Sequence, residues 1–552
     1  MMSRSDELKS GNAKTLGPLI KPMSPEDSST AGGTVRLIAI LLICFGIFAR
    51  FANVNSTPVW HDEVNLILRI NGYTRGEVEK LIANRIIPAS DLSHMHESLG
   101  PPRDVSALID AVKYDSPEHP PTYGLLGFYW AKYFGYSEQS FRWLSSTIGV
   151  LAILGAFWLG TELIGTFSGG LLVAALVCAS PLLVFYSQEI REYCLYILAT
   201  ILSTAALLRG CRICTPMSWI IYALCCAFGC NGSVLFIEVL MAHACYMIWR
   251  ERTQLRISEV GLDISSRLLG YVLATSGAIA LWLPYLCTIF FPSLSVMAKH
   301  TSYLEAPAQQ GSLLNAILFN PGAIFYWIRY SNPAAQNAIL GLLFPSCLIW
   351  MLVTFNRSRR NIFPFLFFYF VPLIVLFWLP DLLFGMQFSL MLRYYLLVPL
   401  AMLMFAAFAV YQHAHAPEPG LKLTAVFGLL FIAGCEVSSD LALQTLRDRE
   451  VMDNQSLSAI ADLQEREGGG LIVSGENGKI INCQQIIALS YALPENSKFL
   501  WLDHPTLPQL PPEIKSFYLY AAPQDLVINV AKSGYILKPQ PGMPYLIKAT
   551  HR

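Results

Sequence analysis

Long apolar runs separated by short polar loops dominate the chain from about residue 34 to residue 437. A helix needs roughly 20 predominantly apolar residues to span the hydrocarbon core of a bilayer. The pattern therefore predicts an all-α polytopic membrane protein with about eleven transmembrane helices. They are expected near residues 34–52, 139–161, 168–186, 193–209, 217–230, 232–249, 268–289, 336–355, 362–380, 389–411 and 422–437.

Three polar segments complete the predicted domain organisation. Residues 1–33 lack an apolar run and are rich in Ser, Gly and Lys, which is typical of a disordered tail. Residues 55–137 form a long first outer loop, in which the apolar stretch 122–134 is too short to span and is predicted to be an interfacial helix. In residues 438–552, short β-like runs alternate with turn residues, which predicts a small C-terminal α/β or α+β domain.

The basic residues predict which side of the membrane each loop faces. If residues 1–33 lie in the cytoplasm, the basic loop residues also fall on the cytoplasmic side, in agreement with the positive-inside rule. These residues are Arg209, Arg212, Arg250, Arg252, Arg256, Arg267, Arg357, Arg359, Arg360 and Lys422. The first outer loop and the C-terminal domain are then extracytoplasmic. A membrane crossing by 122–134 would turn these basic clusters outward, so we disfavour it.

Composition agrees with this class. The chain is 54% hydrophobic and 14% charged, with a mean hydropathy of +0.46. Its formal net charge is zero, so no nucleic-acid partner is expected. The thirteen cysteines lie mostly in apolar runs, which indicates buried side chains instead of a disulfide framework. The Gly468-Gly469-Gly470 run lacks the strand, spacing and acidic partner of a nucleotide-binding loop.

Several polar residues are predicted to converge at the outer face. The carboxylate pair Asp62 and Glu63 directly follows the first apolar run, where a charged side chain usually has a function. Under the predicted topology the same face also holds His119, Glu189, Arg191, Tyr193, Arg393 and Tyr394. Such a set has the chemistry of group transfer from a lipid phosphate: a carboxylate can remove a proton, and Arg can stabilise a leaving phosphate.

Each of these residues also has a purely structural interpretation. Asp62 and Glu63 could be a solvated juxtamembrane pair, His119 a turn residue, and Arg393 a side chain that snorkels to the interface. His94 and His96 suggest a metal site, but no ligand spacing beyond His-x-His supports it. The Cys211-x-x-Cys214 pair lacks a second pair for zinc.

Four motifs together resemble the GT-C class of integral-membrane glycosyltransferases. They are Trp60-x-Asp62-Glu63, His119-Pro120-Pro121 before the interfacial helix, Ser180-Pro181 followed by Ser187-Gln188-Glu189-x-Arg191-x-Tyr193, and Arg393-Tyr394-x-Leu396-x-x-Pro399. Within this class the chain resembles the bacterial protein-mannosyltransferase-like branch, which includes lipopolysaccharide glycosyltransferases and lipid A aminoarabinose transferases. The resemblance covers about residues 35–410. Asn231-Gly232 departs from the aromatic-rich turn of many relatives.

The resemblance implies sugar transfer from a polyprenyl-phosphate donor to a lipid, polysaccharide or protein acceptor on the extracytoplasmic side. Asp62 then acts as general base, supported by Glu63. Glu189, Arg191 and Tyr193 bind or support the acceptor, and His119, Arg393 and Tyr394 meet the donor phosphate. No cofactor is certain; in some relatives a divalent metal such as Mg²⁺ or Mn²⁺ is used, which here would involve Asp62, Glu63 and Glu189. The expected location is a bacterial inner membrane.

A transporter or flippase of a lipid-linked or small polar substrate is the main alternative, since it too combines many spans with buried polar residues. A third hypothesis is that the chain is a non-catalytic membrane subunit. The clustering of the polar residues at one face, and not at the membrane midplane, favours the transferase. A single displacement would invert the anomeric configuration, by analogy with inverting glycosidases. These hypotheses differ in their expected cavity, which opens to lipid in a transferase and crosses the bilayer in a transporter.

Overall fold

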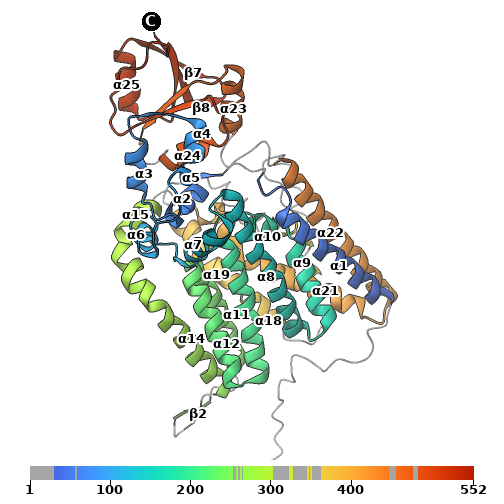
Figure 1. Cartoon of the computed structure of the whole chain (residues 1–552). Helices are drawn as coiled ribbons and strands as arrows, with labels where there is room; N and C mark the ends of the chain where they lie inside the picture. The colour runs from blue at the N-terminus through green and yellow to red at the C-terminus, as the bar shows by residue number, and fades with distance from the viewer. Residues whose placement is uncertain are drawn as a thin grey trace, which may run out of the picture.

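The computed structural model describes residues 30–55, 59–252, 256–258, 261–263, 265–301, 323–326, 345–346, 349–350, 353, 362–446, 455–475 and 483–551. A helical bundle forms one end of the molecule and a small mixed sheet the other (Figure 1). The bundle contains α1 (Thr30–Phe51), α8 (Glu138–Ile164), α9 (Phe167–Ala179), α10 (Pro181–Tyr186), α11 (Tyr193–Ile213), α12 (Pro216–Gly232), α13 (Ile237–Glu251), α14 (Ser266–Tyr285), α18 (Ile362–Phe367), α19 (Phe370–Leu373), α20 (Leu379–Phe384), α21 (Leu397–Ala414) and α22 (Pro419–Leu446).

Among the described residues, seven helices are long and apolar enough to cross a membrane. They are Gly32–Phe51, Glu138–Ile164, Tyr193–Ile213, Ser266–Met297, Pro364–Phe384, Leu397–Ala414 and Pro419–Leu441. The prediction of a polytopic, mostly helical membrane protein with a small C-terminal sheet is confirmed, whereas the count of about eleven spans stays a prediction. The span expected at 336–355 lies largely outside the described residues.

One predicted span is interrupted. The apolar run 168–186 forms α9, which ends at Ala179, and α10, which begins at Pro181. Proline has no backbone N–H for the helical ladder and is tolerated at the first turn of a helix, so a new helix begins at this position. The break leads into the short loop from Ser187 to Glu192 at the end of the bundle where the sheet lies.

Glycines allow the bundle helices to approach closely. A Cβ added at Gly160 of α8 would lie 2.7 Å from the carbonyl oxygen of Gly169 and 2.8 Å from the Cα of Gly170 in α9. Only a residue without a side chain fits such a crossing, which is how small residues pack helices in membranes. Helix α21 is buried along nearly its whole length, as expected for a helix that is apolar on every face.

Residues 59–137 fold into a layer of short elements between the bundle and the sheet (Figure 1). They are α2 (His61–Ile70), α3 (Arg75–Ile82), β1 (Ile86–Pro88), α4 (Ala89–Ser93), α5 (Met95–Ser98), α6 (Val105–Asp115) and α7 (Thr122–Phe134). Helix α7 has the bounds predicted for the short helix at 122–134. It packs tightly on α2, because a Cβ at Gly127 would lie 2.7 Å from the Ile70 side chain.

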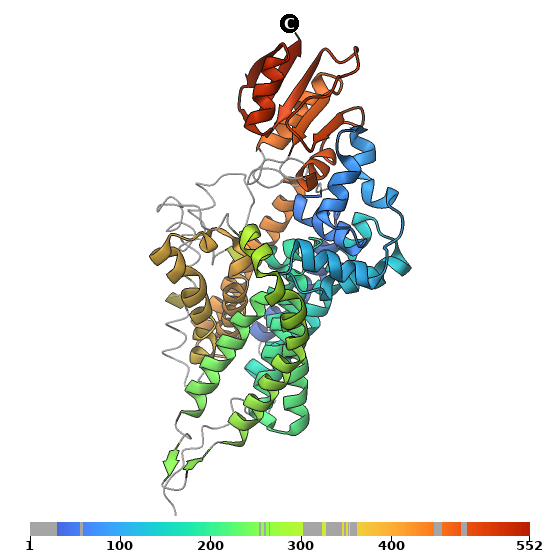
Figure 2. The same cartoon turned by 90° about the vertical axis from the view of Figure 1, so that its left-hand side faces the viewer.

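The C-terminal sheet contains one strand that comes from this layer of short elements. Strands β4 (Leu471–Gly475), β5 (Lys498–Leu502), β6 (Ser516–Tyr520), β7 (Tyr535–Gln540) and β8 (Met543–His551) are joined by β1 in the order β1-β5-β4-β6-β8-β7. Strand β4 pairs in parallel with β5 and β6, and β1 pairs antiparallel with β5, with Ile86 opposite Leu500. Helices α23 (Gln455–Arg466), α24 (Cys483–Ser490) and α25 (Gln524–Lys532) accompany the sheet, as Figure 2 shows from the side.

Candidate active site

The start of α2 separates the two adjacent carboxylates. Trp60 precedes the helix in an extended conformation, and its backbone N–H donates to Glu63 Oε2 at 3.3 Å. Consecutive helical residues point about 100° apart, so Asp62 and Glu63 cannot serve the same surface. Both lie in the first helical turn, where backbone N–H groups and the helix dipole favour negative charge.

Glu63 is buried and fully engaged. Its side chain is 2% exposed. Oε2 lies 2.8 Å from Nη2 of Arg142, and Oε1 accepts from Arg142 Nε at 3.3 Å and from the backbone N–H of Ile190 at 2.9 Å. Arg142 also donates to the carbonyl oxygen of Val54. Glu63 thereby ties α2 to α8 and to the loop before α11.

Asp62 is the carboxylate that faces the cluster of positive charge. Its side chain is 22% exposed. One oxygen lies 3.8 Å from Nη1 of Arg191 and 3.9 Å from Nη1 of Arg393, and the other lies 3.5 Å from His61 Nε2. Burial alone would raise the pKa of Asp62, but Arg191, His61 and Arg393 together hold it well below its ordinary value. Asp62 is therefore an anion attracted by its neighbours at distances longer than ordinary hydrogen bonds.

His119 links the first loop to the loop before α11. Its Nδ1 lies 2.7 Å from Oε1 of Glu192, and its Nε2 lies 3.4 Å from Nη2 of Arg191. Arg191 also approaches Glu192, at 3.5 Å. Burial alone would raise the pKa of the Glu192 carboxyl. The charges of Arg191 and His119 outweigh this effect and hold the pKa well below its ordinary range. The ionised Glu192 thus holds a proton on His119 Nδ1.

Arg69 of α2 belongs to the same charged group, although the sequence analysis did not single it out. Its side chain is buried, and its Nε donates to the carbonyl oxygen of Asn65, but its Nη1 has no hydrogen-bond partner among the described residues. Burial and the charge of Arg191 lower the pKa of Arg69, against the opposing effect of Glu118 and Glu192. The signal was present in the spacing, since Asp62 and Arg69 are seven residues apart and share one face of a helix.

The remaining predicted site residues border this group. Arg393 lies in the short helix Leu392–Tyr395, with its guanidinium 5.5 Å from the ring centre of Tyr394. The ring of Tyr193 is 5.4 Å from the guanidinium of Arg191 and is buried. Glu189 is buried within the loop before α11. The structure therefore brings Asp62, His119, Arg191 and Arg393 together, with Tyr193 and Tyr394 beside them.

The carboxylates of this site do not fit a divalent metal. Asp62 faces Arg191, Arg393 and His61, which compete for its charge and repel a cation. Both oxygens of Glu63 are already bound. Three side chains with ligand atoms within 4.8 Å of one another occur elsewhere in the part of the chain that the structure describes, but not here.

Glu192 gives the site a testable dependence on pH. Because its pKa is depressed in the folded chain, its stabilisation is fully present above the unfolded pKa of about 4.3 and is lost as pH falls through the folded value. We expect Glu192→Gln to lower the free energy of unfolding by about 1–3 kcal/mol at pH 7, with a smaller difference from wild type below about pH 4. Thermal unfolding of the detergent-solubilised protein over a pH series measures this.

Asp503→Asn is the matched control, because Asp503 pairs with His504 at an exposed position and exposed pairs contribute about 0–1 kcal/mol. An effect of Glu192→Gln that is constant from pH 7 to pH 3 would show that the charge of Glu192 does not stabilise the fold.

The comparisons with known proteins come from structure and not from sequence. No protein-family model and no curated protein matches the chain. Among solved structures, it matches ArnT from Cupriavidus metallidurans bound to undecaprenyl phosphate with a TM-score of 0.51 and 10% sequence identity, over 92% of this chain and 97% of that one. The apo form of ArnT matches with a TM-score of 0.50 and 10% identity, over 94% and 98% of the two chains.

A third match is the archaeal oligosaccharyltransferase AglB from Archaeoglobus fulgidus, in complex with an inhibitory peptide and a dolichol-phosphate. Its TM-score is 0.47 and its identity 11%, over 95% of this chain and 75% of AglB. The matches to ArnT show that the chain shares the fold of ArnT, a GT-C glycosyltransferase, along nearly its whole length.

Proposed function

We propose that this chain transfers a sugar from a polyprenyl-phosphate donor to an acceptor on the extracytoplasmic side of the membrane. The observation that carries this proposal is the position of Asp62, a partly exposed anion beside Arg191 and Arg393 at the outer end of a GT-C fold. The ArnT structure that the chain resembles was solved with undecaprenyl phosphate, which supports a lipid phosphate as the carrier. Such a carrier also agrees with the absence of a nucleotide-binding fingerprint from the sequence.

Asp62 orients and then deprotonates the acceptor. In the resting protein its low pKa makes it a weak base, since a general base works best with a pKa near the operating pH. The arginines that lower this pKa are the groups that a donor phosphate would attract. When these arginines turn toward the phosphate, their positive charge stabilises the Asp62 carboxylate less, and the pKa of Asp62 rises. Donor binding therefore activates the base, which keeps the carboxylate inactive while the site lacks donor.

The guanidinium groups receive the leaving phosphate. Arg393 is partly exposed, so it can donate to an incoming oxyanion directly. Arg69 carries a buried Nη1 without a hydrogen-bond partner among the described residues, and it can donate once the side chains that cover it move aside. Charge develops on the phosphate as the bond to the anomeric carbon breaks, and pre-placed donors stabilise it. His119 supports this side of the site through its link to Arg191.

Glu63 has a positioning role instead of a catalytic one in this proposal. Its oxygens hold Arg142 and the backbone of Ile190, so it fixes the loop that carries Arg191 relative to Asp62. Glu189, buried in the same loop, supports this arrangement, and Tyr193 and Tyr394 border the guanidinium groups. A single displacement by the acceptor hydroxyl inverts the anomeric configuration, by analogy with one-step glycosidases.

The test of this function is transfer from a panel of synthetic polyprenyl-phosphate sugars by the purified full-length protein, together with Arg69→Met. We expect transfer by the wild type from at least one donor, and about 10- to 100-fold weaker donor binding by the variant. A lost hydrogen bond to a charged group is worth about 1.5–3 kcal/mol, and Met keeps much of the apolar stem of Arg69.

Arg85→Met is the matched control, because Arg85 is an exposed arginine of the same loop. Equal donor binding by the wild type and Arg69→Met would remove Arg69 from the phosphate site. Wild-type protein that binds no donor in the panel, or that carries a donor across proteoliposomes without transfer, would favour the transporter hypothesis.

A further inference from the structure

A second group of charged side chains lies where the first outer loop meets α8 and the C-terminal domain. His96 and Glu97 come from α5, and Glu138 is the first residue of α8. His96 Nε2 lies 3.3 Å from Oε1 of Glu138 and 4.0 Å from Oε1 of Glu97. Within the described ranges this is the only group of three potential metal ligands whose atoms all lie within 4.8 Å of one another.

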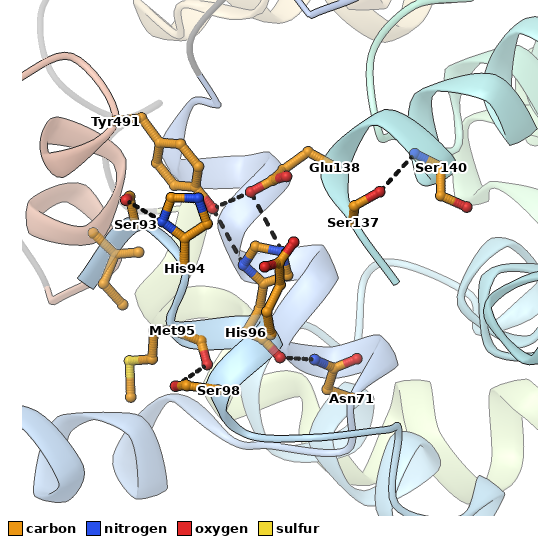
Figure 3. A network of polar contacts seen from close by, with 12 residues as sticks. Asn71, Ser93, His94, Met95, His96, Ser98, Ser137, Glu138, Ser140 and Tyr491 are labelled. Atoms are coloured by element: carbon orange, nitrogen blue, oxygen red, sulfur yellow. Dashed lines mark hydrogen bonds and ion pairs between the residues drawn. The ribbon is translucent and has the colours of Figure 1, made fainter. Parts of the chain in front are cut away.

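Tyr491, just after α24, contacts both His96 and Glu138 (Figure 3). Its hydroxyl donates to Glu138 Oε1 at 2.7 Å and lies 3.3 Å from His96 Nδ1. A hydroxyl carries a single proton, so Tyr491 must accept the hydrogen bond from His96. The proton of a neutral His96 ring is therefore on Nδ1, and Nε2 presents a lone pair.

That lone pair points at negative oxygens. His96 is 4% exposed, and its Nε2 has no hydrogen-bond partner among the residues that the structure describes. A buried nitrogen lone pair facing two carboxylates is repulsive unless a cation lies between them.

The distances fit a small transition-metal ion. Zinc binds imidazole nitrogen and carboxylate oxygen at about 2.0–2.2 Å with tetrahedral geometry, which places two ligand atoms roughly 3.3 Å apart. The Nε2 of His96 and Oε1 of Glu138 already have this separation. Glu97 is 42% exposed, so its carboxylate can close the remaining distance and leave an entry path for the ion. A mixed nitrogen and oxygen set suits zinc better than magnesium.

We propose that His96, Glu97 and Glu138 bind a Zn²⁺-type divalent cation that fastens the first outer loop to α8. Tyr491 fixes the ring and the Glu138 carboxylate from the C-terminal domain, and Asn71 donates to the backbone oxygen of His96. Partners of this kind orient metal ligands. The site is structural and does not depend on the glycosyltransferase proposal.

The hypothesis of a His94-x-His96 site, disfavoured in the sequence analysis, is replaced by a different ligand set. His94 Nδ1 is engaged by the carbonyl oxygen of Ser90 and by the hydroxyl of Ser93, so His94 is no ligand of this site. The ligand that completes the group is Glu138, which lies beyond α6 and α7 in the sequence and could not be recognised from spacing.

The test is the metal content of the purified full-length protein after chelator treatment and dialysis against buffered Zn²⁺. We expect about one Zn²⁺ per chain by mass spectrometry in the wild type and in the control His94→Ala. His96→Ala should lose this ion, and Glu97→Gln should bind it at least about 10-fold more weakly. Added Zn²⁺ should raise the unfolding temperature of the wild type and of His94→Ala, but not of His96→Ala.

Glu97→Gln distinguishes loss of the metal site from misfolding, because this half-exposed residue can be substituted without disturbing the core. Its elution on size exclusion should match the wild type. Equal Zn²⁺ content in the wild type and His96→Ala, or an unchanged Zn²⁺ affinity in a well-folded Glu97→Gln, would overturn the proposal.

Discussion

Asp62→Asn is expected to reduce the kcat/KM of sugar transfer by about 10²–10⁴-fold, the range of general acid–base catalysis. The amide keeps the shape of the side chain but cannot take a proton from the acceptor. The substitution also removes the negative charge that attracts Arg191 and Arg393, so the two guanidinium groups become more available to the donor phosphate. Donor affinity should therefore stay equal or increase while transfer is lost. Single-turnover transfer and equilibrium donor binding, measured on the same preparation, separate the two effects.

Asp91→Asn is the control, since Asp91 is an exposed carboxylate of the same loop. It should leave both measurements unchanged. Transfer by Asp62→Asn at the wild-type rate would show that Asp62 is not the base. Loss of donor binding together with transfer would point instead to a role of Asp62 in forming the phosphate site.

Glu63→Ala is expected to cost about 3–5 kcal/mol of stability, the usual effect of removing one partner from a buried ion pair. The change leaves the guanidinium of Arg142 buried without its carboxylate and the N–H of Ile190 without its acceptor. Thermal unfolding in detergent should show a large decrease in the midpoint temperature. The double variant Glu63→Met with Arg142→Met should recover part of it, because no unpaired charge is then buried.

The matched control is Arg103→Met. Arg103 and Glu77 approach to the same 2.8 Å as Arg142 and Glu63, but both side chains of the control pair are 43% exposed. This change should cost no more than about 1 kcal/mol. If Glu63→Ala unfolds like the wild type and loses only transfer, Glu63 is a catalytic residue and not a positioning one.

Local sequence signals were sufficient to predict the bounds of the helices that position the site. Helix α7 has its predicted bounds because Pro120 and Pro121 favour a start and Gly135, with φ of 81°, provides an end. The apolar runs likewise predicted α1, α8 and α11 closely, since their length is set by the bilayer. The topology argument placed Asp62, His119, Arg191 and Arg393 at one face, and the structure brings them within contact distance of one another through Arg191 and Asp62.

Contacts between distant segments could not be predicted in the same way. Nothing in Ile86-Ile87-Pro88 identifies β5 as its partner, because so short a run carries no register information. Glu63 is buried in an ion pair whereas Asp62 stays partly exposed, and this difference depends on Arg142, which lies in another helix. Arg69 shares a helix face with Asp62, but an arginine in a polar loop is ordinarily solvated, and only tertiary packing shows that its side chain is buried.

The edge strand β1 also sets an order for biosynthesis. Ile86–Pro88 emerges early from the ribosome, whereas its partner Lys498–Leu502 is made near the end of the chain. Until then, the backbone groups of β1 lack their partners, and unpaired strand edges of this kind are prone to wrong pairing. The layer that carries α2 is completed only after nearly all of the polypeptide has been synthesised and inserted. A product truncated before β5 therefore contains the membrane helices without the finished layer that carries α2.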